Sequence, residues 1–265
     1  MKIVHGFMFY NELDLLNYAL NVLDPVIDYF IIVESIHTHM GHIKQLYYQE
    51  NKHLFKQFHD KIIHIIVTDF PYPNPNVANR EQWHNENFQR NAIHRGLQQL
   101  SLNDNDLIII ADLDEIPDPR TIISIKTMPP ISFNAFNMDM YYYNLCVKIH
   151  HNWTLTKILS YKKYIEFRDS GISITDIRLM TGIPEIKMGG WHLSYFGDHN
   201  FIKNKIMEFT HQEYNNDHYI SKIEENIKNG ADLYMRDVTF KYIKICDNTY
   251  LPVMYETYLQ KFIPE

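Results

Sequence analysis

Two aspartates, Asp112 and Asp114, follow directly on the apolar stretch LIIIA at residues 107–111. Side chains two residues apart on an extended chain point to the same side, so both carboxylates can face one ligand where a strand ends. Carboxylate oxygens suit Mg²⁺ or Mn²⁺, and such sites commonly keep water and take phosphate oxygens as further ligands. The pattern therefore predicts a divalent cation at Asp112 and Asp114, next to a phosphorylated substrate.

An Asp-x-Asp pattern also fits other roles. The aspartates could form an acidic turn that caps a helix beginning near Pro119. A haloacid-dehalogenase-like phosphatase would use Asp112 as its nucleophile, but such enzymes carry the motif near the chain start, usually with a threonine two residues later. Here the motif lies in mid-chain and residue 116 is isoleucine. A nucleotide-sugar glycosyltransferase, whose metal binds the donor diphosphate, fits better. A non-catalytic carbohydrate-binding protein with the same fold stays open.

The segments that must position these aspartates alternate between strand-like and helix-like patterns. Strands are expected over residues 2–9, 26–34, 61–68 and 107–111, and helices over 12–23, 44–58 and 79–100. This alternation predicts an α/β fold with a mostly parallel central sheet flanked by helices on both faces. Ligands of such sheets bind beyond the carboxyl ends of the strands, which is where the 107–111 strand would deliver its aspartates.

The second half of the chain has a weaker pattern. Residues 133–143 alternate like a strand, residues 150–190 form mixed short segments, and residues 198–229 look largely helical. The three prolines of DFPYPNPN (69–76) interrupt regular structure. No internal repeat or low-complexity linker divides the chain, so we expect a single domain over residues 1–265.

Composition excludes several classes of protein. The net charge is −7 with no block of Lys or Arg, so nucleic acid is not an expected partner. The two cysteines, Cys146 and Cys246, provide neither a disulfide framework nor a zinc pattern and suit a reducing compartment. The first residues lack the apolar core of a signal peptide, and no apolar stretch approaches membrane length. We therefore expect a soluble, cytoplasmic protein without a membrane span.

Five segments stand in order along nearly the whole chain: FMFYNELDLL (7–16), VESIHTHMGHIKQLYY (33–48), REQWHNENFQRNAI (80–93), ADLDEIPD (111–118) and GGWHLSYFG (189–197). Together they resemble glycosyltransferase family 17. A sixth segment, KIMEFTHQEYN at 205–215, is a weaker match.

The resemblance implies an inverting glycosyltransferase with a nucleotide-sugar-binding fold of the GT-A type. It implies a UDP-sugar donor, typically UDP-GlcNAc, a divalent metal and a hydroxyl of a glycan or glycoconjugate as acceptor. The nucleotide-sugar-binding half would span about residues 1–118, and the acceptor and catalytic half about residues 119–265. A later histidine often completes the metal site in GT-A enzymes, which here would be His192; its alternative is an imidazole hydrogen-bonded in the core.

The resemblance also suggests which residues bind the donor. Glu34, at the end of the second strand, would bind the nucleoside. Arg80 or Arg90 would lie near the diphosphate, and Asp112 near ribose or donor-sugar hydroxyls. Trp191 would stack on a sugar or sit in the core. The candidates are Asn11, Glu12, Glu34, Arg80, Arg90, Asp112 and Trp191.

Two of these candidates also have simple structural explanations. Asn11 has the residue type that caps a helix, here the one expected from residue 12. Arg90 is spaced i,i+4 from Glu86, so the two could form an ordinary surface pair.

An inverting transferase also needs a carboxylate that takes the proton of the acceptor hydroxyl. Asp176 and Glu185 lie between the Asp-x-Asp motif and His192, the interval where GT-A enzymes often place this base. Glu213 is a third candidate. Each of the three could instead be a solvated surface acid.

Overall fold

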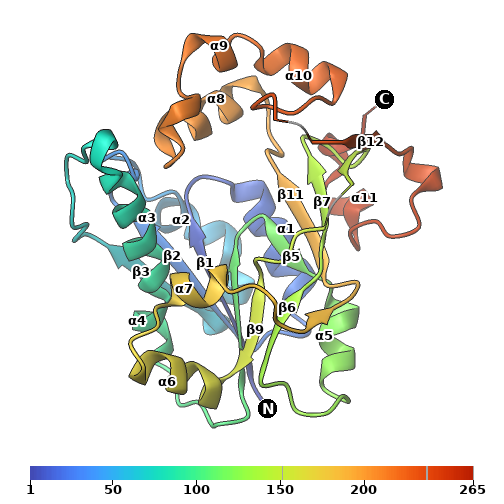
Figure 1. The fold of residues 1–265 in the computed structure, drawn as a ribbon. Coiled ribbons are helices and arrows are strands. Elements are labelled where there is room, and N and C mark those ends of the chain that lie inside the picture. The colour runs from blue at the N-terminus through green and yellow to red at the C-terminus, as the bar shows by residue number, and fades with distance from the viewer. Residues whose placement is uncertain (151, 237, 265) are drawn as a thin grey trace.

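The computed structural model describes residues 1–150, 152–236 and 238–264, and two β-sheets form its centre (Figure 1). The larger sheet has seven strands in the order β10-β6-β9-β4-β1-β2-β3, and the smaller has five in the order β12-β8-β7-β11-β5. Their bounds are β1 Ile3–Phe9, β2 Tyr29–Ser35, β3 Ile62–Val67, β4 Leu107–Asp112, β5 Glu115–Pro117, β6 Phe133–Phe136, β7 Asp139–Tyr142, β8 Val147–Ile149, β9 Lys157–Ser160, β10 Glu185–Ile186, β11 Gly190–Ser194 and β12 Phe240–Tyr242.

The four strands expected from the first half of the chain form a parallel core, β4-β1-β2-β3. Their register aligns Phe7 with Ile32 on one side and with Ala111 on the other. Strands β1, β2 and β4 are buried on both faces, which explains their continuous apolar sequences, whereas the edge strand β3 is partly exposed. The prediction of an α/β fold with helices around a central sheet is confirmed.

The prediction that the sheet is mostly parallel is wrong in the second half, because the sheet is mixed. Strand β9 returns between β4 and β6 and pairs antiparallel with both. In the smaller sheet β11 is parallel to β7 but antiparallel to β5, and β7 is antiparallel to β8. Short strands joined over long sequence distances carry little periodicity, so the sequence pattern could not indicate these directions.

Helices cover both faces of the larger sheet. Alternate β2 residues face opposite sides: Phe30 and Ile32 pack with α1 (Leu13–Leu23), whereas Ile31 and Val33 pack with α4 (Ile93–Leu97). The second face also carries α3 (Glu81–Asn91), α6 (Tyr161–Asp169) and α7 (Ile174–Leu179). The remaining helices are α2 Tyr47–Asn51, α5 Pro119–Ile125, α8 His199–Glu208, α9 Asp217–Ile220, α10 Ile223–Asn229 and α11 Tyr255–Tyr258, with short 3₁₀ turns at 52–61, 77–79, 212–214, 245–247 and 260–262.

Two expected helices are shorter or broken. The helix expected over 44–58 begins only at Tyr47, where the Glu34 carboxylate accepts hydrogen bonds from the backbone N–H groups of Tyr48 and Gln49. These donors have no partner within a first helical turn, so an acceptor there determines where the helix starts. The helix expected over 79–100 is divided into α3 and α4 at Ala92.

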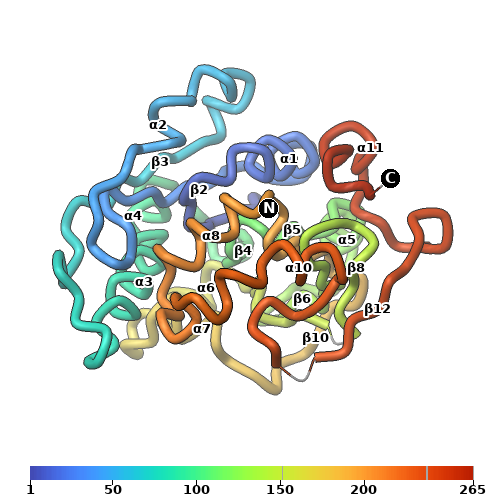
Figure 2. The backbone as a smooth tube through the Cα atoms, turned by 90° about the horizontal axis from the view of Figure 1, so that it is seen from above, coloured from blue at the N-terminus to red at the C-terminus, as the bar shows by residue number. Residues whose placement is uncertain are grey.

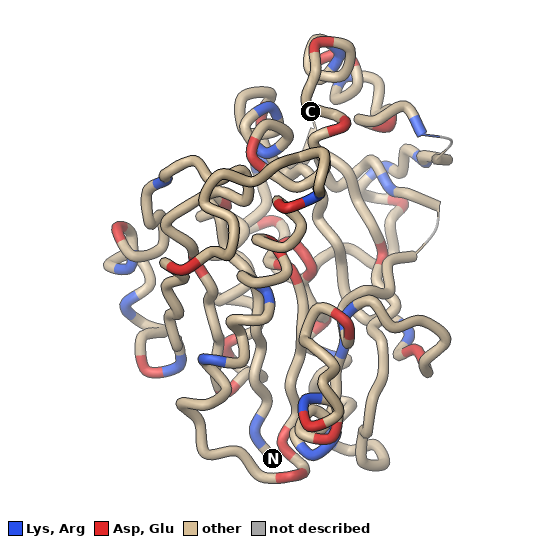
Figure 3. The backbone as a smooth tube through the Cα atoms, turned by 60° about the vertical axis from the view of Figure 1, so that its left-hand side comes forward, with Lys and Arg blue, Asp and Glu red and all other residues tan. Residues whose placement is uncertain are grey.

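The segment with α8, α9 and α10 lies across the carboxyl edge of the parallel strands, opposite the N-terminus (Figures 1 and 2). Asp198 caps α8 by accepting a hydrogen bond from the backbone N–H of Phe201. Lys and Arg are interspersed with Asp and Glu over the whole backbone (Figure 3). Within the described residues, no helix combines the length and the apolar character needed to cross a bilayer. The covered edge is where the parallel sheet would bind a ligand.

Candidate active site

A cavity of about 410 Å³ lies at the carboxyl edge, between the parallel sheet and the α8–α10 segment. The end of β1, the loop after β2, helix α3, the β4–β5 turn, strands β7 and β11, and helix α8 all contribute to its wall. This volume is in the range of small-molecule binding sites. On this wall Asp112 and Asp114 meet Arg90 and His192, which come from distant parts of the sequence.

Asp112 ends β4 and is held by two arginines. Arg178 on α7 donates from Nη2 to Asp112 Oδ2 at 2.7 Å, and Arg90 on α3 donates from Nη2 to Asp112 Oδ1 at 3.2 Å. Burial disfavours the charged carboxylate, but the two guanidinium groups outweigh it and lower the pKa of Asp112. Both oxygens of Asp112 therefore already have cationic partners.

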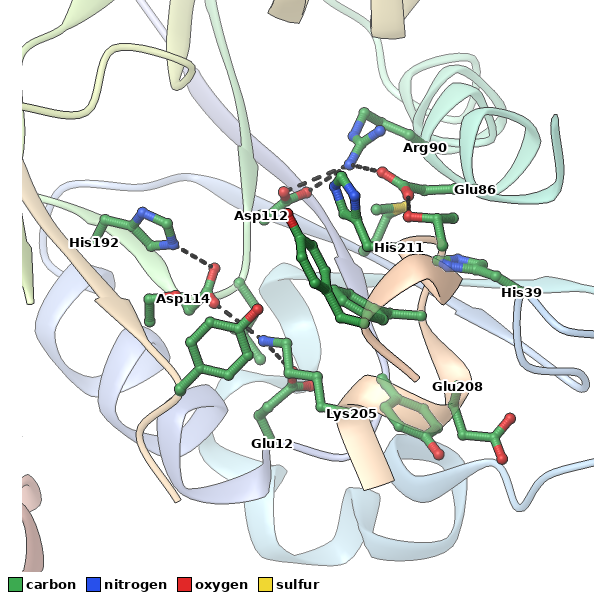
Figure 4. A pocket seen from close by; sticks show the side chains of 18 of the residues that line it. Glu12, His39, Glu86, Arg90, Asp112, Asp114, His192, Lys205, Glu208 and His211 are labelled. Atoms are coloured by element: carbon green, nitrogen blue, oxygen red, sulfur yellow. Dashed lines mark hydrogen bonds and ion pairs between the residues drawn. The ribbon is translucent and has the colours of Figure 1, made fainter. Parts of the chain in front are cut away.

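Asp114 lies in the two-residue turn between β4 and β5, with one group at each carboxylate oxygen (Figure 4). His192 Nε2 is 3.5 Å from Oδ1, and the Lys205 ammonium donates to Oδ2 at 3.2 Å. Lys205 Nζ is also 3.5 Å from Glu12 Oε1. Burial opposes ionisation of Asp114, yet the charges of Lys205 and His192 prevail and lower its pKa. Asp114 is thus an anion at all ordinary pH values.

His192 reaches Asp114 because β11 pairs with β5. The antiparallel register places Gly190 opposite Pro117 and His192 opposite Glu115, one residue after Asp114. Gly190 has φ +133°, and a Cβ there would lie 2.1 Å from the carbonyl oxygen of Ile116. Glycine is therefore required for this approach. The His192 ring lies against Trp153, with ring centroids 4.4 Å apart, and its Nδ1 has no hydrogen-bond partner among the described residues.

The other pocket carboxylates differ in their partners. Glu86 on α3 accepts from Arg90 at 2.8 Å and from Thr210 at 2.6 Å; burial opposes its charge, but Arg90 and His39 lower its pKa. Glu208 on α8 pairs through Oε2 with His42 Nδ1 at 2.9 Å. Among the described residues, Glu208 is the pocket carboxylate that has no Lys or Arg partner.

Aromatic side chains form the side of the pocket below the α8–α10 segment. Tyr214 and Tyr234 stack with ring centroids 3.9 Å apart, and the Tyr195 and Tyr234 hydroxyls are hydrogen-bonded to each other. Burial raises the pKa of both Tyr195 and Tyr234, so these hydroxyls stay neutral. Tyr142, Trp153, Phe209 and Tyr214 also line the pocket. Rings and neutral hydroxyls of this kind can contact the faces and the hydroxyl groups of a sugar.

Comparison with known proteins decides the family. The sequence pattern described as glycosyltransferase family 17 matches residues 1–249. The chain belongs to glycosyltransferase family 17. Two curated relatives, from Rattus norvegicus and Homo sapiens, are named beta-1,4-mannosyl-glycoprotein 4-beta-N-acetylglucosaminyltransferase. Each is 26% identical to this chain over 129 residues, which are 47% of the chain but only 23% of the rat and 24% of the human protein.

A solved structure also shows some likeness to this family 17 chain. HddC from Yersinia pseudotuberculosis is 13% identical to it, with a TM-score of 0.41 over 70% of this chain and 89% of that one.

Four of the donor-binding candidates chosen from the sequence do not line the pocket. Glu34 is fully buried and occupied by the start of α2, by His64 at 3.1 Å and by Lys44 at 3.7 Å. Trp191 is fully buried on the opposite face of β11 from His192 and donates to the Tyr250 carbonyl, which supports its core alternative. Arg80 is exposed over the Trp83 ring. Asn11 precedes α1, but its side chain does not cap that helix.

The three predicted base candidates also lie outside the pocket lining. Asp176 forms a capping box with Ser173 at the start of α7, accepting from the Ser173 backbone N–H at 2.9 Å. Glu185 is exposed and accepts from the Asn137 amide at 2.6 Å. Glu213 is exposed too, but its partner His211, at 2.7 Å, lines the pocket. Of the three, Glu213 is therefore the candidate that contacts a residue of the pocket lining.

In the acidic segment at 112–118, the residue that caps a helix is Asp118. Its side chain accepts a hydrogen bond from the backbone N–H of Arg120 at the start of α5, next to Pro119. Asp112 and Asp114 are thus free of the capping role that the sequence left open for them.

Several residues that line the pocket or hold its aspartates were not among the candidates chosen from the sequence. Lys205 and Glu208 lie three residues apart in KIMEFTHQEYN, whose resemblance to the family was the one available signal. Arg178 and Trp153 come from the segment of mixed short elements, where no pattern distinguished them.

Proposed function

We propose that the protein transfers a sugar from a UDP-sugar to a hydroxyl of a glycan or glycoconjugate acceptor, with inversion at the transferred carbon and on a fold of the GT-A type. The observation that carries this proposal is the position of Asp114 at the carboxyl edge of the parallel sheet, in a sugar-sized pocket of a family 17 chain. The names of the two curated relatives support GlcNAc as the transferred sugar.

The donor diphosphate would lie beside the β4–β5 turn. Lys205 and Arg90 line this part of the pocket and can attract phosphate oxygens. Arg90 also holds Asp112, and the remaining lone pairs of that carboxylate can accept hydrogen bonds from ribose or sugar hydroxyls. The negative charge that develops on the leaving UDP would be offset by these cations, which would already contact the bound diphosphate before the reaction begins.

A divalent cation, Mn²⁺ or Mg²⁺, is part of this proposal, and the side chains present fit it in one arrangement. Asp114 Oδ1 and His192 Nε2 lie 3.5 Å apart and could both be ligands. Within the described residues no three His, Cys, Asp or Glu side chains form a prearranged site. Two protein ligands completed by phosphate and water suit a cation that arrives with a nucleotide. When bound, it would neutralise charge on the leaving diphosphate.

Glu208 is the pocket carboxylate best suited to accept the acceptor's proton. A general base needs an available oxygen, and the other pocket carboxylates are held by Lys or Arg. Glu208 instead contacts His42, whose imidazole can share the proton. The aromatic wall of Tyr142, Tyr195 and Tyr234 would hold the acceptor sugar nearby.

The decisive experiment measures UDP release from a panel of UDP-sugars with glycan acceptors, with and without Mn²⁺, against hydrolysis as background. We expect UDP-GlcNAc to give acceptor-dependent release. Asp114→Asn should lower turnover about 10²–10³-fold, because the carboxylate that would hold the charge-offsetting cation is lost. Asp169→Asn, an exposed aspartate paired with Arg168 outside the pocket, is the matched control and should keep full turnover. If neither the wild type nor the Asp169→Asn variant releases UDP from any donor, the proposal is refuted.

A further inference from the structure

Lys205 holds the position next to Asp114 that a cation would need. Its ammonium lies between Asp114 Oδ2, at 3.2 Å, and Glu12 Oε1, at 3.5 Å, in the pocket (Figure 4). The Lys205 side chain is 22% exposed, and Asp114 and Glu12 are 12% and 11% exposed. This is a largely desolvated ammonium between two carboxylates, with the Tyr195 ring 5.4 Å from Nζ.

The same carboxylate would have to serve a divalent cation. Asp114 Oδ1 faces His192, while Oδ2 is taken by Lys205. A metal on Asp114 would therefore lie within a few ångströms of the ammonium, and like charges repel strongly at that distance where water is largely excluded. Lys205 and the metal cannot both keep full contact with Asp114.

A nucleotide would change this balance. Lys205 lines the pocket and extends from α8, so its flexible side chain can turn from Asp114 towards an anion in the cavity. A diphosphate offers the ammonium a new partner at the moment when the metal needs Asp114. Metal and nucleotide would then strengthen each other's binding.

We propose that Lys205 is the resident cation of Asp114, that it competes with the divalent cation, and that a nucleoside diphosphate relieves this competition. The proposal rests on the proposed function, because it takes the ligand to be a UDP-sugar bound with a metal. In this proposal, Lys205 weakens metal binding as long as no nucleotide is bound. A purely structural ion pair that fixes α8 to the sheet edge would not couple the two ligands.

The test titrates the full chain with MnCl₂ and follows free Mn²⁺ by electron paramagnetic resonance, first alone and then with saturating UDP, against a titration of the same UDP without protein that accounts for Mn²⁺–UDP complexes in solution. We expect the wild type to bind Mn²⁺ weakly alone and about tenfold or more tighter with UDP, a typical coupling between two ligands. Lys205→Met should bind Mn²⁺ alone about tenfold tighter than the wild type, and UDP should then tighten Mn²⁺ binding by a smaller factor than it does in the wild type, because only direct ligation by phosphate remains.

Two controls separate charge from shape and from folding. Lys205→Arg keeps the positive charge and should behave like the wild type, whereas Lys203→Met changes an exposed lysine on the same helix outside the pocket and should alter nothing. Mn²⁺ affinity that is unchanged or weaker in Lys205→Met overturns the proposal, as does undetectable Mn²⁺ binding by every folded variant. The readout does not depend on sugar transfer, so it remains decisive if no donor proves active.

Discussion

Arg178 and Glu115 form a buried ion pair although they lie 63 residues apart in the chain: Nη1 of Arg178 donates to Glu115 Oε2 at 2.7 Å. Glu115 is fully buried and also accepts from the Thr156 hydroxyl at 2.6 Å. The second arm of the same guanidinium holds Asp112 at 2.7 Å. One buried arginine on α7 therefore ties this helix to the end of β4 and the start of β5, on either side of the turn that contains Asp114.

Replacing Arg178 should destabilise the protein severely. Arg178→Met leaves the Glu115 carboxylate buried without its cation, and a broken buried pair typically costs about 3–5 kcal/mol of unfolding free energy. Urea unfolding followed by circular dichroism measures the loss. Arg168→Met, which removes an exposed arginine paired with Asp169, should leave the midpoint unchanged. Adding Glu115→Gln to Arg178→Met should recover part of the loss, and a further drop would contradict this account.

Gly190 should be intolerant of a side chain. A Cβ at Gly190 meets the Ile116 carbonyl oxygen at 2.1 Å in addition to the strain of φ +133°, so Gly190→Ala should lose about 2 kcal/mol or more of unfolding free energy. Gly171 is the matched control: it has φ +78°, but a Cβ there meets nothing within 4 Å. Thermal melting of both variants should show the smaller loss for Gly171→Ala. Equal losses would mean that the contact with Ile116 relaxes freely.

The parallel core could be predicted from the sequence because each of its strands is a short apolar stretch. β4 shows this most clearly, since LIIIA is buried on both faces and ends at Asp112. The position of β9 could not be predicted in the same way. Its pairing with β4 and β6 depends on contacts between distant segments, and four residues carry no readable period.

The candidate site was predictable where residue type and element end coincide. Asp112 and Asp114 were chosen because they follow a strand and His192 because of the resemblance to GT-A enzymes, and all three line the pocket. Lys205 and Glu208 were missed because charged residues on an amphipathic helix usually face solvent, and only the sheet edge beneath α8 makes them pocket residues. Glu34 was chosen by its place at a strand end, yet its carboxylate accepts a hydrogen bond from the backbone at the start of α2.

Glu208 should be needed for turnover more than for donor binding. Glu208→Gln removes the proposed base, so kcat should fall about 10²–10⁴-fold while the KM for the UDP-sugar changes little. Glu185→Gln and Glu213→Gln alter exposed acids outside the pocket lining and should retain activity. Steady-state UDP release with a fixed acceptor compares the three variants. A large loss of kcat in Glu213→Gln with none in Glu208→Gln would instead assign the role of general base to Glu213, one of the three candidates from the sequence.

His5 should make the fold sensitive to mild acid. It is fully buried on β1, and neither ring nitrogen has a hydrogen-bond partner among the described residues. Burial lowers the pKa of His5 from 6.5 to about 3, so between these values the unfolded chain binds a proton that the folded chain does not. The stability linked to His5 is therefore complete above about pH 6.5 and is lost progressively as the pH falls towards 3.

His5→Phe removes this titration while keeping a ring beside Phe7 and Phe30, the neighbours of His5 at 5.0 and 6.2 Å between ring centroids. Urea unfolding at about pH 7.5 and about pH 5.5 should show the wild type losing about 1 kcal/mol more than the variant over this interval, since one proton corresponds to about 1.4 kcal/mol per pH unit. The comparison between the two proteins cancels the other titrating groups. Parallel losses in both would show that the His5 imidazole finds a proton partner in the folded chain.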